Sequence, residues 1–247
     1  SAGACATVLL SRDLGHASAW ATLAAVVAWS RVHVGAHHAT DVVDELGVDR
    51  VDGILLDLGL SSDQLADEKR GFSFDAAGPL DLRFDATQGE SASALVARLP
   101  ERELADLIFR LGEERYSRRI ARRIVERRRE QPIETAEQLA RIVRGCVPRS
   151  LDRIDPATRT FQALRIAVNG ELESLATALA SFPGRLRSGG RLAIISFHSL
   201  EDRLVKEAFR SDERLDPLTK KPLRASEAEI ARNPRSRSAK LRVAARR

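Results

Sequence analysis

The sequence predicts an α/β fold, with a parallel sheet that is interrupted by a block of helices. Two short runs rich in Ile, Leu and Val, at 51–58 and 191–197, are typical of strands buried on both faces of a parallel sheet. Helix-forming segments accompany both runs, and the stretch from 101 to 143 has the composition of helices alone. The 247 residues therefore fit one α/β domain that carries an inserted helical domain.

The domain boundaries follow from where the pattern changes. We expect residues 1–75 and 158–247 to form the α/β domain and residues 76–157 to form the insertion. The stretch 61–88, rich in Gly, Asp and Ser, predicts an ordered loop. Ahead of the 51–58 strand we expect strands at 7–10 and 31–34 and helices at 17–29 and 40–46.

The rest of the chain predicts helices first and then a return of the α/β pattern. In the insertion we expect two helices over 101–129, broken near Gly112, and a shorter helix at 135–143. The expected elements after it are a helix at 161–179, a turn at 188–190, the 191–197 strand, a helix at 200–209, a polar loop at 212–233 and an edge strand at 240–244. Ligands of such sheets bind beyond the carboxyl ends of the strands, so the loops after Leu56 and Ser196 are the expected ligand-binding loops.

Charge and cysteine content limit the function classes. Lys and Arg number 40 against 35 Asp and Glu, a net charge of +5 that mildly favours polyanionic partners. The two cysteines, Cys5 and Cys146, are isolated, which argues against a disulfide scaffold and fits a cytoplasmic protein. No apolar run reaches transmembrane length, so we expect no membrane partner. Because the chain lacks methionine even at position 1, we expect it to begin inside a domain.

Asp57 follows the first buried strand, in the sequence Asp-Leu-Gly-Leu-Ser-Ser. A carboxylate at this place can accept hydrogen bonds from a ligand amine or hydroxyl, and Gly59 lets the backbone approach a ligand closely. The alternative is that Asp57 only caps the next turn.

His198 follows the second buried strand. It is a candidate base or base-stacking group. Ser199 with Asp202 also matches a helix capping box, so a structural histidine beside a capped helix is the equal alternative.

Arginines recur at helical spacing in the insertion, and a second basic segment lies near the end of the chain. We expect Arg115, Arg118, Arg119 and Arg122, together with Arg235 and Arg237, to bind RNA phosphates. The alternative for the first group is a solvated helix face paired with nearby glutamates. The cluster His33, His37 and His38 lacks a Cys, Asp or Glu at ligand spacing, so we expect no metal site.

Six segments resemble the bacterial 16S rRNA (cytosine-N4)-methyltransferases of the MraW type. They are VDGILLDLGLSSDQLADEKRGFSF at 51–74, GPLDLRFD at 78–85, GEERYSRRIARRIV at 112–125, TRTFQALRIAVNGELESL at 158–175, SGGRLAIISFHSLEDRLVK at 188–206 and NPRSRSAKLRVA at 233–244. The resemblance implies a Rossmann-like methyltransferase fold with an RNA-contacting insertion, S-adenosylmethionine as cofactor, and N4-methylation of a cytidine in small-subunit rRNA.

The resemblance also implies site residues. The strand-end Asp and a Gln that bind the cofactor in the family correspond to Asp57 and Gln64. The Asp-Arg-Asp of the family is matched by Ser11-Arg12-Asp13, so Ser11 stands where an acid contacts the ribose, and a cofactor-lining Phe aligns with Ala36 or Gly35. The Gly-rich loop GxGGHS that opens the family pattern is absent here, which leaves the cofactor site degenerate at this end.

The expected catalytic residues are Asp57, Ser61, Ser62 and His198. Asp57 would contact either the cofactor or the target amine, and the others would contact the target base. The competing hypothesis is a non-catalytic RNA-binding or ribosome-assembly factor that keeps the fold. The sequence leaves both a monomer and a homodimer open.

Overall fold

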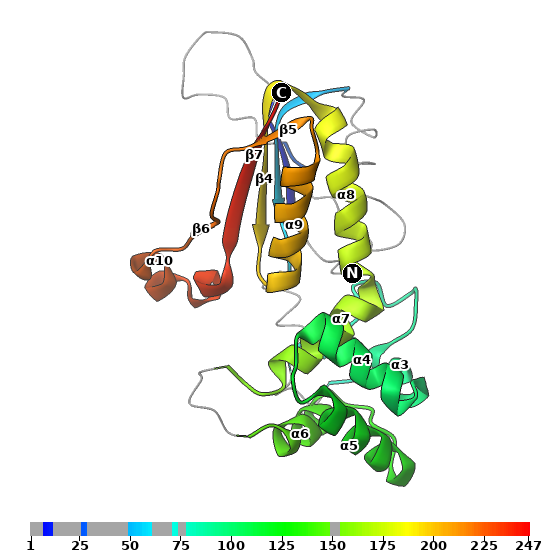
Figure 1. Cartoon of the computed structure of the whole chain (residues 1–247). Coiled ribbons are helices and arrows are strands. Elements are labelled where there is room, and N and C mark those ends of the chain that lie inside the picture. Colours follow the sequence, from blue (N-terminus) through cyan, green and yellow to red (C-terminus); the bar gives the residue numbers. More distant parts are fainter. Residues whose placement is uncertain (1–6, 12–25, 29–48, 61–70, 74–77, 149–153) are drawn as a thin grey trace. The chain divides into compact units, whose positions relative to one another are not determined.

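The computed structural model describes residues 7–11, 26–28, 49–60, 71–73, 78–148 and 154–247, the first two of these ranges as backbone only (Figure 1). The chain divides into two compact units. A helical unit comprises Ser61–Glu171, and a sheet unit comprises Ala4–Leu60 and Leu172–Arg247. The insertion predicted over 76–157 lies within the helical unit, and its predicted boundaries remain a prediction.

The sheet unit is built on a mixed sheet of order β2-β1-β3-β4-β7-β5, with β6 paired to β7. Its strands are β1 (Thr7–Ser11), β2 (Val26–Ala28), β3 (Val51–Asp57), β4 (Leu186–Ser196), β5 (Leu215–Pro217), β6 (Leu223–Arg224) and β7 (Lys240–Arg246). Among these strands only β3 and β4 run parallel, and all other pairs are antiparallel. The α/β class is confirmed, whereas the expectation of a parallel sheet holds for its central pair alone.

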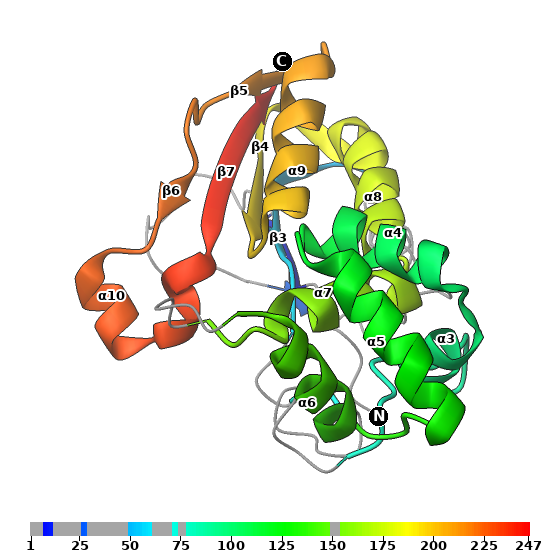
Figure 2. The same ribbon diagram turned by 60° about the horizontal axis from the view of Figure 1, so that its bottom comes forward.

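One face of the sheet carries the core of this unit. The register pairs Ile54 with Leu192 and Leu56 with Ile194, and all four side chains are buried on the same face. The helices α8 (Glu171–Arg185) and α9 (Ser199–Ser211) lie along the sheet in Figure 2, and their apolar side chains are part of this buried cluster. Burial of each large side chain stabilises the fold by about 1.5–3 kcal/mol, so these four side chains anchor β3 and β4 to the core.

Several predicted elements of the sheet unit need correction. The predicted helix at 17–29 is wrong at its end, because Val26–Ala28 forms β2, and the predicted elements at 31–34 and 40–46 lie outside the described residues. The predicted loop at 212–233 contains β5, β6 and α10 (Glu227–Arg232).

The end of the chain also differs from the prediction. β7 is no edge strand, because it lies between β4 and β5. The predicted turn at 188–190 falls inside β4, at a point where the pairing with β3 shifts register between Val51 and Gly53. The Gly-Gly pair therefore marks an irregularity within a longer strand rather than its beginning.

The helical unit contains five described helices. They are α3 (Ala92–Arg98), α4 (Glu101–Gly112), α5 (Ser117–Glu130), α6 (Ala136–Cys146) and α7 (Thr158–Asn169). The predicted break near Gly112 is confirmed, because Glu113 adopts a left-handed conformation with φ of 51° and ends α4. The predicted helix at 161–179 is wrong as one element, because Gly170, with φ of 57°, separates α7 from α8.

Close helix packing gives the helical unit its shape. Ile108 of α4 is fully buried, and so are Ile120 and Ile124 of α5. The spacing of four residues between Ile120 and Ile124 places both on one apolar face of α5. A Cβ atom at Gly112 would lie 2.4 Å from the carbonyl oxygen of Arg159. Only glycine therefore permits this approach of α4 to α7, and the arginine-bearing side of α5 faces away from the apolar core.

Candidate functional site

The carboxyl ends of β3 and β4 meet at one edge of the sheet because these two strands are parallel. The register pairs Asp57 with Ile195, and the Leu58 amide donates to the Ile195 carbonyl at 3.0 Å. The loops that follow the two strands thus leave the sheet side by side. The two loops expected to bind a ligand therefore begin at the same edge of the sheet, and ligand binding by them stays a prediction.

Asp57 has an unusual environment for a carboxylate. Its Oδ1 atom is buried and has no hydrogen-bond partner among the described residues. Burial raises the pKa of Asp57 above its ordinary value, and the negative charge of Glu201 raises it further. A buried acceptor without a partner is rare in folded proteins and marks a place where a ligand donor would fit.

Gly59 and Phe197 bring the two loops into contact. Gly59 has φ of +98°, a conformation that side chains rarely adopt, and a Cβ atom there would lie 3.1 Å from the Phe197 ring. Glycine at this position therefore allows the aromatic ring to lie directly against the backbone that follows Asp57. Sequence reasoning identified Gly59 but gave Phe197 no role.

His198 is the N-cap of α9, and it is tied to Glu201 in a reciprocal capping box. Its Nδ1 accepts from the Glu201 amide at 3.3 Å, while Glu201 Oε2 accepts from the amides of Phe197 and His198 at 2.8 and 3.3 Å. Since Nδ1 accepts, a neutral ring carries its proton on Nε2. That atom is buried and lies 3.2 Å from Glu201 Oε1, without the alignment of a hydrogen bond.

The capping box therefore differs from the prediction that Ser199 and Asp202 form it. Glu201, only 3% exposed, holds the loop that carries Phe197 and His198, and the sequence analysis missed it. The signal was present, since an acid three residues after a cap residue is the capping pattern, but a histidine at the cap concealed it.

Asp202 instead joins α9 to the last strand. Its carboxylate accepts from Arg242 of β7 at 2.7 and 3.2 Å, and Lys240 Nζ lies 3.8 Å away. Burial alone would raise the pKa of Asp202, but the hydrogen bond and charge of Arg242, with that of Lys240, lower it overall. The pairing fixes the first turn of α9, and with it the position of His198 at the sheet edge.

The other residues expected near the cofactor are not brought to this edge by the described structure. Since β1 runs antiparallel to β3, Ser11 pairs with Gly53, whereas Thr7 is the residue opposite Asp57. Ser11 thus lies toward the other end of β3, away from the shared carboxyl edge. The remaining expected positions, Asp13, Ala36, Ser61, Ser62 and Gln64, lie outside the described residues.

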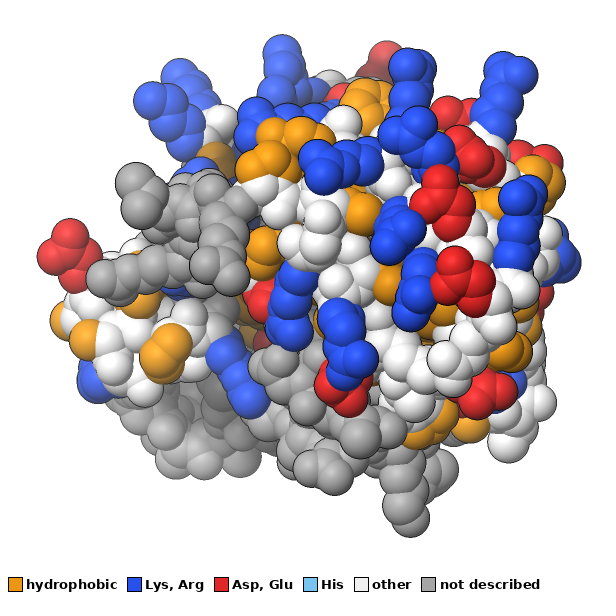
Figure 3. Space-filling view, turned by 90° about the horizontal axis from the view of Figure 1, so that it is seen from below, with side chains coloured by type: hydrophobic (Ala, Val, Ile, Leu, Met, Phe, Trp, Pro, Cys, Tyr) orange, Lys and Arg blue, Asp and Glu red, His pale blue; other side chains and the backbone are white. Residues whose placement is uncertain are grey.

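The expected RNA-binding arginines of the helical unit are exposed on or beside α5. Arg118, Arg119 and Arg122 have no acidic partner within ion-pair distance in the described structure, whereas Arg123 pairs with Glu126 at 3.2 Å. Arg115 stacks over the Tyr116 ring at 4.9 Å. Figure 3 shows Arg and Lys side chains projecting from the face seen from below, with acidic side chains among them. The pairing alternative therefore accounts for only part of this surface.

The second basic segment belongs to the sheet unit. Arg235 and Arg237 are exposed on the 3-10 helix η2 (Pro234–Ser238), directly ahead of β7.

Arg128 of α5 has a structural role, because its guanidinium donates to the carbonyl of Leu99 at 2.7 Å and to that of Val96.

Comparison with known proteins decides the family. The sequence profile of the MraW methylase family matches residues 17–247. The chain belongs to the MraW methylase family. The resemblance found in its six sequence segments is thereby confirmed, and so is the methyltransferase type of α/β fold.

Close relatives in the MraW family share the name ribosomal RNA small subunit methyltransferase H. The protein of Synechococcus elongatus is 58% identical over 199 residues, which are 80% of this chain and 66% of the relative. That of Rhodopirellula baltica is 56% identical over 207 residues, or 83% and 64% of the two chains, and that of Sorangium cellulosum is 55% identical over 202 residues, or 81% and 64%. The chain thus spans slightly less than two thirds of the length of these relatives.

A helix that crosses a bilayer must be long and apolar, and this limits what the described helices of this MraW family member can do. None of them combines the length and the apolar character that a membrane crossing requires.

Replacing Asp57 with Asn is expected to raise the free energy of unfolding. The folded-state pKa of Asp57 lies above its ordinary value of 3.8, so between the two values the folded chain keeps a proton that the unfolded chain has lost. Stability then falls as the pH rises through this window. The advantage of Asp57→Asn over the wild type should be smallest below the window and largest above it, as measured by urea unfolding across a pH series.

Asp52→Asn is the matched control on the same strand. The Asp52 carboxylate is paired with Arg187 at 2.9 Å, so this variant should lose stability rather than gain it. If the difference in unfolding free energy between Asp57→Asn and the wild type stays constant across the pH series, the charged form of Asp57 is not destabilised by its burial.

Proposed function

We propose that this chain carries out S-adenosylmethionine-dependent N4-methylation of a cytidine in small-subunit ribosomal RNA. The observation that carries the proposal is the buried, unpartnered carboxylate oxygen of Asp57 at the shared edge of β3 and β4, in a chain of the MraW methylase family. The relatives named ribosomal RNA small subunit methyltransferase H supply the substrate class. Since its substrate would be ribosomal RNA, we expect the protein to act in the cytoplasm. Both a monomer and a homodimer are compatible with this proposal.

The residues at this edge suit a ligand that both donates and accepts hydrogen bonds. Asp57 Oδ1 offers an acceptor, and His198 Nε2 offers a donor, both buried and without a hydrogen bond in the described structure. When bound, S-adenosylmethionine supplies an activated methyl group. Among the residues expected to hold it, Asp57 is the one that the described structure places at the edge, and Gln64 and Asp13 would complete the set.

Asp57 suits the proton transfer that amine methylation requires. The lone pair of cytosine N4 is delocalised into the ring, so the amine needs an acceptor for one of its protons as the new bond forms. A carboxylate whose pKa is raised by burial and by Glu201 is a stronger base than an exposed one. Asp57 would use its two carboxylate oxygens for two contacts, one with the cofactor and the other with N4, whose proton it accepts.

Phe197 and His198 would hold the target base. An enzyme that acts on a base amine must take the base out of its stack, and aromatic side chains commonly replace the lost stacking. Phe197 lies against Gly59, two residues from Asp57, and His198 is fixed by Glu201. The capping box would thus orient the surface on which the cytosine rests, and Ser61 and Ser62 are further candidates for contact with it.

The arginines of α5 and η2 would bind the RNA backbone. An exposed guanidinium group can bind two phosphate oxygens at once, and such contacts carry no information about the base sequence. They would position the RNA, while the sheet edge would select the base.

Asp57→Ala is expected to reduce methyl transfer by at least about 10²-fold, because the amine loses its proton acceptor. Transfer of a radiolabelled methyl group to small ribosomal subunits measures this, with circular dichroism to check folding. Asp52→Ala, at the other end of β3, is the control and should keep its activity. Undiminished transfer by Asp57→Ala would remove this residue from the mechanism.

Replacing Arg118, Arg119 and Arg122 together with Gln should weaken RNA binding and flatten its salt dependence. Each phosphate contact contributes somewhat less than one unit to the slope of log K against log salt, so the slope should become shallower by up to about 2 units. The corresponding Lys triple variant keeps the charge and should keep most of the slope. An unchanged slope in the Gln variant would assign this helix face to solvent.

A non-catalytic RNA-binding factor is the second candidate. Ser11 stands where the family has an acid, and the register of β1 places it away from Asp57. Titration calorimetry with S-adenosylmethionine separates the two candidates. We expect the wild type to bind S-adenosylmethionine and Asp57→Ala to bind it more weakly or not at all. If the folded wild type does not bind S-adenosylmethionine, the second candidate is favoured.

A further inference from the structure

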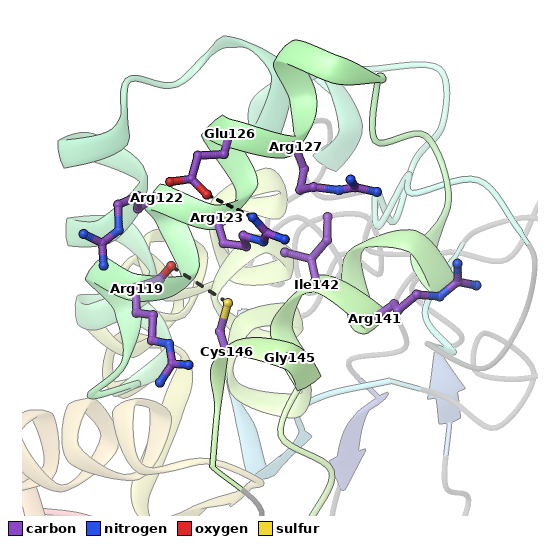
Figure 4. Close-up of a pocket in the computed structure, with 9 residues that line it drawn as sticks. All are labelled: Arg119, Arg122, Arg123, Glu126, Arg127, Arg141, Ile142, Gly145 and Cys146. Atoms are coloured by element: carbon purple, nitrogen blue, oxygen red, sulfur yellow. Dashed lines mark hydrogen bonds and ion pairs between the residues drawn. The ribbon is translucent and has the colours of Figure 1, made fainter.

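A cationic hollow lies between α5 and α6, within the helical unit. Its volume is about 690 Å³, and Figure 4 shows the side chains around it. Four arginines come from α5, namely Arg119, Arg122, Arg123 and Arg127, and Arg141 comes from α6. Arg141 was not among the arginines that the sequence analysis singled out.

The positive charge of the hollow is incompletely balanced. Arg123, Arg127 and Arg141 form ion pairs with Glu126, Glu130 and Glu137, at 3.2, 2.6 and 2.5 Å. These pairs are exposed, and exposed ion pairs are worth at most about 1 kcal/mol, so a stronger acceptor can take over the guanidinium groups.

Two arginines of the hollow have no such pairing. Arg119 and Arg122 have no acid within ion-pair distance in the described structure. Burial raises the pKa of the Cys146 thiol, which therefore stays neutral beside them and adds no compensating negative charge.

The arginines follow one stripe of α5. Positions 119, 123 and 127 are spaced by four residues and position 122 follows 119 by three, so these side chains project on the same side of the helix. The stripe extends over about 12 Å at 1.5 Å per residue. This length exceeds a single phosphate and suits successive phosphates of one strand. Apolar lining, which small organic ligands require, is limited here to such residues as Ile142 and Cys146.

We propose that this hollow binds consecutive backbone phosphates of the RNA substrate. The inference rests on the proposed action on ribosomal RNA, and it adds a defined binding site between α5 and α6 to the exposed arginine face. Planar guanidinium groups bind phosphate oxygens through two parallel hydrogen bonds, which fixes the strand in orientation as well as in place. The site would hold the RNA by its backbone, independently of the chemistry at the sheet edge.

Gly145 offers a test that leaves every arginine in place. It lines the hollow near the end of α6, and a Cβ atom added there has no heavy atom within 4 Å. Gly145→Glu places a carboxylate among the guanidinium groups, Gly145→Gln is its neutral counterpart of equal size, and Gly145→Lys reverses the charge. Thermal unfolding of all three checks that the helix is intact.

Binding to a fluorescently labelled small-subunit rRNA transcript is measured by anisotropy over a series of salt concentrations. We expect Gly145→Glu to bind about tenfold more weakly than Gly145→Gln, with a slope of log K against log salt that is shallower by about one unit. Gly145→Lys should bind at least as tightly as Gly145→Gln. Equal affinity and equal slope for the Glu and Gln variants would overturn the proposed site.

Methyl transfer by the wild type separates this outcome from failure of the proposed function. If the wild type methylates small subunits while the Glu and Gln variants bind alike, the activity stands and the hollow is not the phosphate site. If the wild type transfers no methyl group but the Glu variant binds the transcript more weakly than the Gln variant, the hollow binds RNA in a non-catalytic protein.

Discussion

The parallel pairing of β3 with β4 is the constraint on which the candidate site depends. Strands that run in the same direction end at the same edge, and the register that pairs Ile54 with Leu192 also sets Asp57 beside Ile195. The same register gathers the buried side chains of both strands on one face, where α8 and α9 cover them. Hydrophobic burial thus holds in place an edge that is itself polar, and the arrangement of the chemical groups follows from the packing of the core.

The edge combines well-satisfied and unsatisfied groups. Glu201 accepts two backbone hydrogen bonds and caps α9, so the loop that carries Phe197 and His198 is fixed before any ligand arrives. Asp57 has the opposite character, since one of its oxygens is buried without a partner and its pKa is raised. Such a cost in stability is common at functional sites, where a ligand supplies the missing partner.

The sequence predicted the parts of the structure that local pattern controls. The strand at 51–58 and the helix break at Gly112 follow from apolar runs and from a glycine, and the structure contains both. It could not predict that β1 and β7 run antiparallel to their neighbours, because strand direction depends on contacts between distant segments. Phe197 was missed for the same reason, since its role arises only where it meets Gly59. Glu201 was missed although its capping role is local, because a histidine occupies the cap position.

The strand order has a consequence for the biosynthesis of the chain. β3 and β4 pair across more than a hundred intervening residues, and β7, which lies between β4 and β5, comes after all the other described strands in the sequence. The described part of the helical unit lies within one segment, Ser61–Glu171, so its synthesis is complete well before that of β7. β7 can join the sheet only after Lys240–Arg246 has been synthesised, so the contact of Arg242 with Asp202 at the start of α9 forms on a nascent polypeptide whose arginine-bearing unit has already been made.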